Sequence, residues 1–372
     1  MGLIRASVEQ AVRGQAGMRG AVDSHNRVHR GYPWRVLAST LMTWPPFVLP
    51  ACVQDDADSG AVLADTGGDS GESTDDTLPP AIADAFLNED SGPLGPLILP
   101  KPVTDVPRWE VRMATSPDCE AWTASDTVIA WALSSLSGIV LGDVIVLNAN
   151  IDMSKALRLG VPDPLSAVPI LVTRDLTTWN SAELPITETA SDYITDSSLW
   201  VDGNDALHAV YFSAVDGSGD PAGQQGPHDI DDAVWTDDTL VEAPEPIFSA
   251  EGLADPIVAR TGDHWTLFTT ESANAVTLAT STDGVSFTAN AQVWSTVSVP
   301  SAWAGEDGSV NLVAQHIDGH DAPDRARVGA DGVLEVQDPL YDAHPWGDNC
   351  TSPVVLPWND GFVLFCAVRV IR

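Results

Sequence analysis

Thr173-Arg-Asp-Leu-Thr-Thr-Trp179 is one of three copies of a seven-residue pattern, in which Ser or Thr precedes an Asp by two residues and an aromatic follows the Asp by four. The other two copies begin at Ser116 and Ser281, and they read Ser-Pro-Asp-Cys-Glu-Ala-Trp and Ser-Thr-Asp-Gly-Val-Ser-Phe. An Asp in this setting caps nearby backbone N–H groups, and the aromatic begins the next strand. The pattern therefore predicts a hairpin turn that recurs along the chain.

Two weaker copies fill the gaps in this series, so that a turn recurs about every 55 residues: Asp231 with Trp235, and Asp331 with the strand after it. Between the turns lies a second repeated element, an apolar strand, a polar turn and another apolar strand. Clear examples begin at Asp196 and Asp255. Each unit thus contains four strands in two hairpins, which is the content of one propeller blade.

The two ends of the repeat are complementary half-units. The segment 109–125 is a second hairpin without a first, and the segment 352–370 is a first hairpin without a second. Joining them completes a fifth unit and removes exposed sheet edges. The sequence therefore predicts an all-β fold, a five-bladed β-propeller closed by pairing of its N- and C-terminal strands. Two β-sandwiches would explain the alternating strands but not the complementary ends.

Three cysteines, Cys119, Cys350 and Cys366, fall in the predicted closing blade. In an oxidising compartment two of them are expected to form a disulfide. A bond to Cys119 would staple the two chain ends together, whereas a bond between the other two would lie within one hairpin. The sequence leaves these pairings open.

The N-terminal segment 1–52 has a composition of its own, with six Arg and two acidic residues. Arg30 and Arg35 precede an apolar run that ends in small residues, which is the order of an export signal. Its end, Leu49-Pro-Ala-Cys52, resembles the lipobox of bacterial lipoproteins. We therefore expect export and a lipid anchor on Cys52 at the bacterial cell envelope. An ordinary cleaved signal, giving a periplasmic or secreted protein, is the alternative.

The segment 53–102 is an acidic linker rich in Gly, Ser and Pro, and its first part, 53–80, holds eight acidic residues and no Lys or Arg. Such a composition cannot bury enough apolar area to offset the entropy lost on ordering. The predicted organisation is an export signal over 1–52, this linker, and a propeller over 103–372.

Charge restricts the partners. The 372 residues include 17 Lys and Arg against 53 Asp and Glu, a net charge of −36. Nucleic acids and anionic lipid surfaces both require clustered cations on the protein, so neither is an expected partner. Membrane contact is expected only through the lipid anchor at Cys52, and neutral or cationic ligands stay open.

The predicted ring brings the starts of its inner strands together around one end of the axis, where a ligand site is expected. The residues expected there are Asp196, Asp255 and Ser301, with Glu251, Asp348 and Asn349 on the entering loops. Two carboxylates about one blade apart can divide general acid and base duties, because burial and mutual repulsion separate their pKa values.

At these residues the sequence resembles glycoside hydrolase family 43 and its arabinanase and levansucrase-type relatives, over about 109–370. The resemblance is carried by Asp196 with its apolar strand, by Ala254-Asp-Pro-Ile-Val258 and by the recurring turns. It implies a five-bladed propeller that cleaves arabinose, xylose or related linkages with an Asp base, an Asp modulator and a Glu acid from three successive blades. Asp196 matches the position of the modulator. Ser137-Gly138 occupies the position where the family has its Asp base, and Asp255 occupies the position of its Glu acid.

Because two of the three catalytic positions differ from the family's pattern, two functions remain open. One is an inverting hydrolase with the atypical catalytic set Asp196, Asp255 and Glu251, since inversion needs one protonated and one ionised carboxyl group. The other is a non-catalytic surface lipoprotein that binds glycan or protein. In either case Ser301, Asp348 and Asn349 are expected to contact the ligand.

No cofactor is expected, although a structural cation on the propeller axis stays open. His316, His320 and Asp321 lie close together in the sequence, but no metal-ligand spacing recurs, so we interpret them as loop residues.

Overall fold

The computed structural model describes residues 108–131, 134–150, 167–187, 195–214, 227–236, 239–271, 274–305, 307–317, 322–341, 345–346 and 350–370. Regular structure in these residues consists of β-strands. None of them forms a helix long and apolar enough to cross a membrane. The predicted export signal, the linker and Cys52 lie outside the described residues.

Four sheet units are built from consecutive strands, and each is one blade. The first blade contains β3 (Ser134–Leu141), β4 (Val144–Asn150), β5 (Ala167–Thr173) and β6 (Asn180–Thr187). The second contains β7 (Thr195–Val201), β8 (Leu207–Ala214), β9 (Pro227–Thr236) and β10 (Thr239–Glu242). The third contains β12 (Leu253–Thr261), β13 (His264–Glu271), β14 (Ala275–Ser281) and β15 (Thr288–Ser295). The fourth contains β16 (Val297–Ala304), β17 (Val310–His316), β18 (Asp324–Val328) and β19 (Leu334–Gln337).

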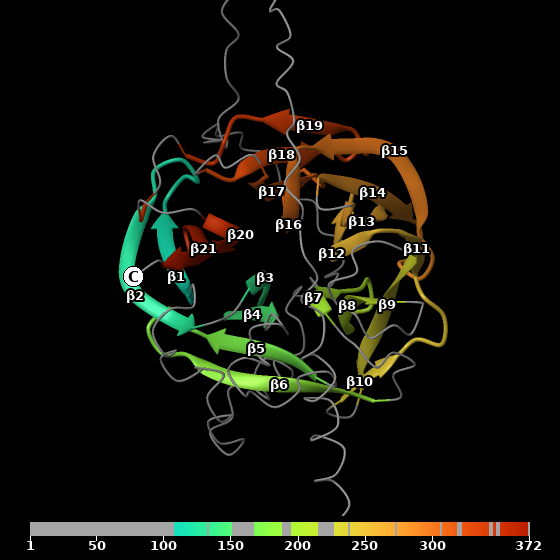
Figure 1. Cartoon of the computed structure of the whole chain (residues 1–372), viewed down its shortest axis with the longest axis horizontal. Helices are drawn as coiled ribbons and strands as arrows, with labels where there is room; N and C mark the ends of the chain where they lie inside the picture. The colour runs from blue at the N-terminus through green and yellow to red at the C-terminus, as the bar shows by residue number, and fades with distance from the viewer. Residues whose placement is uncertain are drawn as a thin grey trace, which may run out of the picture. The chain divides into compact units, whose positions relative to one another are not determined.

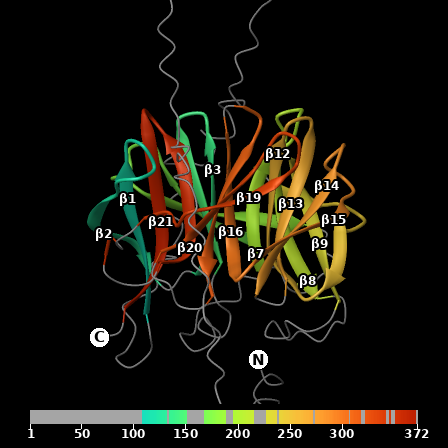
Figure 2. The same ribbon diagram turned by 90° about the horizontal axis from the view of Figure 1, so that it is seen from above.

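The fifth blade joins the two ends of the repeat, as predicted. It has the strand order β2-β1-β21-β20, formed by β1 (Arg108–Ser116), β2 (Thr123–Trp131), β20 (Cys350–Trp358) and β21 (Gly361–Val370). β1 and β21 pair antiparallel from Arg108 opposite Val370 to Ser116 opposite Phe362. Figure 1 shows the five blades arranged as a ring with β3, β7, β12, β16 and β20 nearest its centre. In the perpendicular view of Figure 2 the strands stand roughly upright.

The recurring turn lies between the third and fourth strands of a blade, and its Asp caps the backbone. Asp118 accepts hydrogen bonds from two N–H groups of the same turn, at 3.0 and 3.1 Å. Asp175 accepts two at 2.8 and 2.6 Å, and Asp283 two at 2.9 and 3.3 Å. These backbone donors hold the chain in its reversal. The structural role predicted for the pattern is thereby confirmed in three blades.

The second blade departs from the predicted repeat. Asp231 lies inside β9, directly opposite Tyr211 of β8, so its prediction as a turn residue was wrong. A parallel pairing of Leu240 in β10 with Ile186 in β6 joins the first two blades into one nine-stranded sheet. In addition, β11 (Phe248–Glu251) pairs with β9. Asp231 and Trp235 have the spacing of the turn pattern, and only the pairing of β9 with β8 shows that they lie within a strand.

In the described part of the chain the hydrophobic core is divided into five clusters, one between each pair of neighbouring blades. For example, Phe268 and Leu312 belong to the cluster between the third and fourth blades. Val111 and Leu147 belong to the cluster that joins the fifth blade to the first. A blade is thus covered on both faces, which explains why its inner strands are apolar almost throughout.

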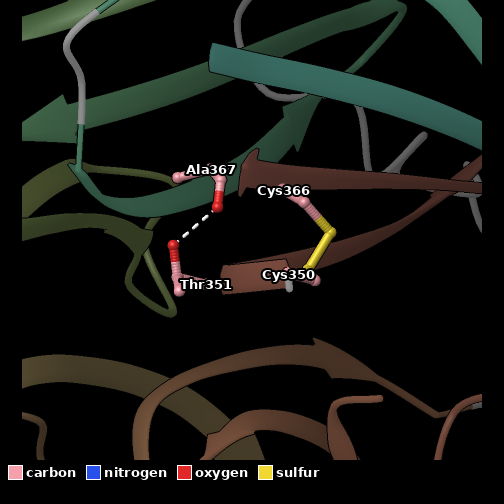
Figure 3. The surroundings of a disulfide bond; sticks show 4 residues. All are labelled: Cys350, Thr351, Cys366 and Ala367. Carbon is pink, nitrogen blue, oxygen red and sulfur yellow. Dashed lines mark hydrogen bonds between the residues drawn. A yellow bond between two sulfur atoms is a disulfide. The ribbon is translucent and has the colours of Figure 1, made fainter. Parts of the chain in front are cut away.

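The disulfide joins Cys350 to Cys366 across β20 and β21, within the last hairpin (Figure 3). Beside it the Thr351 hydroxyl donates a hydrogen bond to the carbonyl of Ala367 at 2.6 Å. Cys119 is buried in the same apolar cluster and takes no part in the disulfide. Ring closure therefore depends on backbone pairing and packing, and no covalent bond links the two chain ends in the described residues.

Candidate functional site

Every inner strand contains a β-bulge near its start, where the backbone turns to a positive φ. The five residues concerned have φ between 48° and 50°: Ser135, Asp196, Asp255, Val299 and Ser352. In each case the strand register shifts at that point. A bulge of this kind re-aims a side chain, and a positive φ in a residue other than Gly costs free energy. The bulges define which residues of the five blades are equivalent.

This register corrects two positions of the sequence prediction. The first-blade residue equivalent to Asp196 is Ser135 rather than Ser137, and the fourth-blade residue is Val299 rather than Ser301. Both predicted residues lie two places further along their strands. The error has a physical reason, because a bulge inserts a residue that the apolar pattern of a strand does not reveal.

Asp196 and Asp255 line one hollow, formed where the starts of four inner strands meet. Its empty volume is about 190 Å³, part of which opens to solvent. The lining residues come from the first four blades: Ser135, Leu136, Ser137, Asp196, Ser197, Ser198, Asp255, Pro256, Ile257, Val299 and Pro300. Among the described residues, the lining contains two carboxyl groups and no Lys, Arg or His.

The pKa of Asp255 is strongly perturbed. The residue as a whole is only half-buried, but its carboxyl group is desolvated. This burial raises the pKa of Asp255 well above its usual range, and the negative charge of Asp196 raises it further. A hydrogen bond with the side chain of Thr270 acts in the opposite direction on the same pKa. We therefore expect Asp255 to hold its proton at a pH where an ordinary aspartate has lost it.

The serines of the hollow hold the inner strands together. The Ser198 hydroxyl donates to the carbonyl of Pro256 in the next blade at 2.6 Å. One blade earlier, the Ser137 hydroxyl donates to the carbonyl of Ser197 at 3.3 Å. These bonds cross from blade to blade directly after the two bulges, so they help to fix the separation of Asp196 and Asp255.

Sequence reasoning missed Asn148. It is fully buried in β4, its amide donates to the Ser197 carbonyl, and its Oδ1 shares the single hydrogen of the Ser137 hydroxyl with that carbonyl. A buried amide is stabilised only when its polar atoms are paired. The signal in the sequence was an isolated Asn directly after the apolar run Val144–Leu147.

The other predicted site residues are not brought to the hollow. Glu251 is exposed at the end of β11, opposite Pro227 of β9, and does not line it. Ser301 is 1% exposed and does not line it either. Asp348 and Asn349 lie outside the described residues.

The histidine cluster is likewise only partly described. His316 Nδ1 lies 2.7 Å from Asp324 Oδ2, whereas His320 and Asp321 lie outside the described residues. In the described part of the chain no three His, Cys, Asp or Glu side chains gather as a metal site would require.

Fold and site together define the class of this protein, a five-bladed β-propeller with a pair of carboxyl groups in the hollow at its axis. Similar solved structures include an exo-β-1,3-galactanase from Phanerochaete chrysosporium, with 12% identity and a TM-score of 0.45, covering 70% of this chain and 64% of the galactanase. Another is an endo-1,4-β-xylanase from Bacteroides thetaiotaomicron, with 12% identity and a TM-score of 0.43, covering 61% and 84%. A third is an exo-β-1,3-galactanase from Clostridium thermocellum, with 10% identity and a TM-score of 0.46, covering 66% and 60%.

The chain thus spans less than two thirds of the length of either galactanase. No family model matches it, and no curated protein matches it in sequence.

Proposed function

We propose that this chain is a glycan-processing propeller in which Asp255 and Asp196 act as a general acid and its ionised partner. The supporting observation is that the two carboxyl groups share one hollow, while burial and the charge of Asp196 raise the pKa of Asp255. Hydrolysis of a glycosidic bond requires such a pair, one carboxyl group protonated and the other ionised.

In the proposed reaction Asp255 gives its proton to the glycosidic oxygen as the bond to the anomeric carbon breaks. Water attacks that carbon and releases a proton, which the Asp196 carboxylate accepts. One proton leaves Asp255 and one arrives at Asp196, so exchange with solvent restores the starting state. The neighbouring blades hold both groups through the Ser198–Pro256 and Ser137–Ser197 bonds, which limits the motion of the pair.

A second candidate is a module that binds glycan or protein without turnover. Ser135 favours it, because the first-blade position equivalent to the two aspartates carries a hydroxyl group instead of a third carboxyl group. A serine hydroxyl group stays protonated near neutral pH, so it cannot accept a proton as a carboxylate base does.

A substrate screen separates the two functions. The purified protein is incubated with arabinan, xylan, β-1,3-galactan and fructan, and both reducing-end release and binding are measured. For an enzyme we expect turnover that falls by about 10²-fold or more in Asp255→Asn and Asp196→Asn. Asp360→Asn, in the exposed turn between β20 and β21, is the matched control and should act as the parent. Saturable binding without turnover would instead establish the binding module.

We also propose that the protein is exported and anchored through Cys52. The disulfide Cys350–Cys366 supports export, since such bonds persist in oxidising compartments. Cys52→Ala should abolish incorporation of labelled palmitate in a bacterial host and release the protein from the membrane fraction. Cys119→Ala should leave both unchanged. Labelling that survives in Cys52→Ala would exclude this anchor.

A further inference from the structure

Thr270 lies between two neighbouring blades, at a point where it touches Asp255. It is 1% exposed near the end of β13 and pairs with Ala254, the residue before the bulge of the third blade. Its hydroxyl oxygen accepts the N–H of Val299, the bulge residue of the fourth blade, at 3.0 Å. The same side chain hydrogen-bonds to Asp255.

These contacts determine which way the hydroxyl hydrogen points. A threonine hydroxyl has one hydrogen to donate and two lone pairs. The Val299 N–H occupies one lone pair of the oxygen, so the hydrogen and the second lone pair remain. When Asp255 is ionised, its carboxylate can only accept, and the Thr270 hydrogen then points to it. The bulge of the fourth blade therefore orients Thr270, and Thr270 in turn contacts the carboxyl group of the third.

We propose that Thr270 is a positioning residue for Asp255: the Thr270 hydroxyl group holds one carboxyl oxygen and leaves the other available to a ligand in the hollow that Asp255 lines. The placement of the carboxyl group stands on the contacts alone, whereas its consequence for catalysis rests on the proposed function. In a hydrolase this placement would present the proton to the glycosidic oxygen rather than to the protein.

The groups around Asp255 predict the direction in which its pKa should change when the Thr270 hydroxyl is removed. The Thr270 bond lowers the pKa of Asp255, against the larger effects of burial and of Asp196 on β7. β16 contributes only Val299 and Pro300 to the hollow, and neither titrates. On the side of β9, His228 Nδ1 contacts the carbonyl of Leu253, two residues before Asp255. Removing the Thr270 hydroxyl should therefore raise the pKa of Asp255 further.

The test compares Thr270→Val, which keeps the shape and removes the hydroxyl, with Thr270→Ser, which keeps the hydroxyl. Thr269→Val is the matched control, because Thr269 is the neighbouring residue on β13, is 2% exposed, and bonds instead to Thr277 at 3.0 Å. The titration of Asp255 is followed in the full chain by NMR of its labelled carboxyl carbon. Thr270→Val should titrate at higher pH than the parent, whereas Thr270→Ser and Thr269→Val should titrate as the parent does.

Kinetics provide a second readout if the protein proves to be a hydrolase. Thr270→Val should lower kcat about tenfold, as expected for one lost hydrogen bond to a carboxyl group, and leave KM nearly unchanged. Should Thr270→Val not fold, Thr270→Ala removes the same hydroxyl group together with the methyl group. An Asp255 titration unchanged in the folded variant would overturn the proposal, whether or not any glycan is hydrolysed. Absence of turnover with a shifted titration would instead contradict only the enzymatic function.

Discussion

Asp255 is placed where an aspartate is costly for the fold. Its φ of 48° lies in the left-handed region, its carboxyl group is desolvated, and Asp196 repels its charge. Asp tolerates this backbone conformation better than most residues other than Gly, but it gains nothing from burial. Strain and unfavourable electrostatics that coincide at one residue are typical of functional sites.

The raised pKa of Asp255 predicts how stability depends on pH. An unfolded aspartate ionises near pH 4, so between that pH and the higher folded pKa the folded state binds more protons. Stability of the parent should therefore fall as the pH rises through this window, and Asp255→Asn should lack this loss. Urea unfolding of both from pH 4 to pH 8 measures the difference, which should grow as the pH rises above the unfolded pKa. A constant difference would contradict the raised pKa.

At the scale of elements, the recurring turn explains why hairpins form at regular intervals. The Asp of each turn is exposed, and hydrogen bonds from backbone N–H groups lower the pKa of Asp118, Asp175 and Asp283. The preceding Ser or Thr contributes as well, since the Ser281 hydroxyl donates to Asp283 at 2.7 Å. All of these contacts are local, so each turn can form before distant strands meet.

Capping of the turns predicts a pH dependence of stability that is opposite in sign to the one predicted for Asp255. A carboxyl group whose pKa is lowered on folding stabilises the fold above its unfolded pKa near 4, and this contribution is lost as the pH falls through the folded pKa. Asp175→Ala should therefore lower the melting temperature at pH 7 and have less effect as the pH falls below 4. Asp126→Ala, at an exposed position within β2 and outside the turns, is the matched control. Differential scanning calorimetry across pH 2–7 measures both. An effect of Asp175→Ala that stayed constant with pH would argue against charge-dependent capping.

At the scale of the molecule, closure depends on the close approach of β1 and β21. Gly361 begins β21 directly beside the end of β1, and a Cβ placed there would lie 2.5 Å from the backbone oxygen of Ser116. Backbone cannot move aside as the end of a flexible side chain can. The disulfide does not span this junction, since both of its cysteines belong to the last hairpin.

Gly361→Ala should accordingly destabilise the protein by about 1–3 kcal/mol, the usual cost of overpacking. Gly203→Ala is the matched control, because a Cβ at that turn position meets nothing within 4 Å. Urea denaturation measures both free energies of unfolding. Equal stabilities of the two variants would show that closure does not depend on tight packing at this junction.

The number of blades and the way the ring closes could be predicted from the sequence. Local sequence patterns predict the hairpin turns and the apolar strands. The half-units at 109–125 and 352–370 can be recognised in the sequence without knowledge of any contact. The resulting prediction of paired chain ends is confirmed by β1 and β21. Asp196 and Asp255 were found for the same reason, because each immediately precedes an apolar run.

The tertiary structure decided which residues occupy the bulges and line the hollow, because these positions depend on the pairing between strands. The bulges arise from strand register, so only the folded chain shows that Ser135 and Val299 occupy the positions expected for Ser137 and Ser301. Glu251 is near Asp255 in sequence, but it belongs to β11, which pairs with β9 of the second blade, and it does not line the hollow. The contact of Thr270 with Asp255 joins residues of two different strands, and no local pattern in a sequence records such a distance.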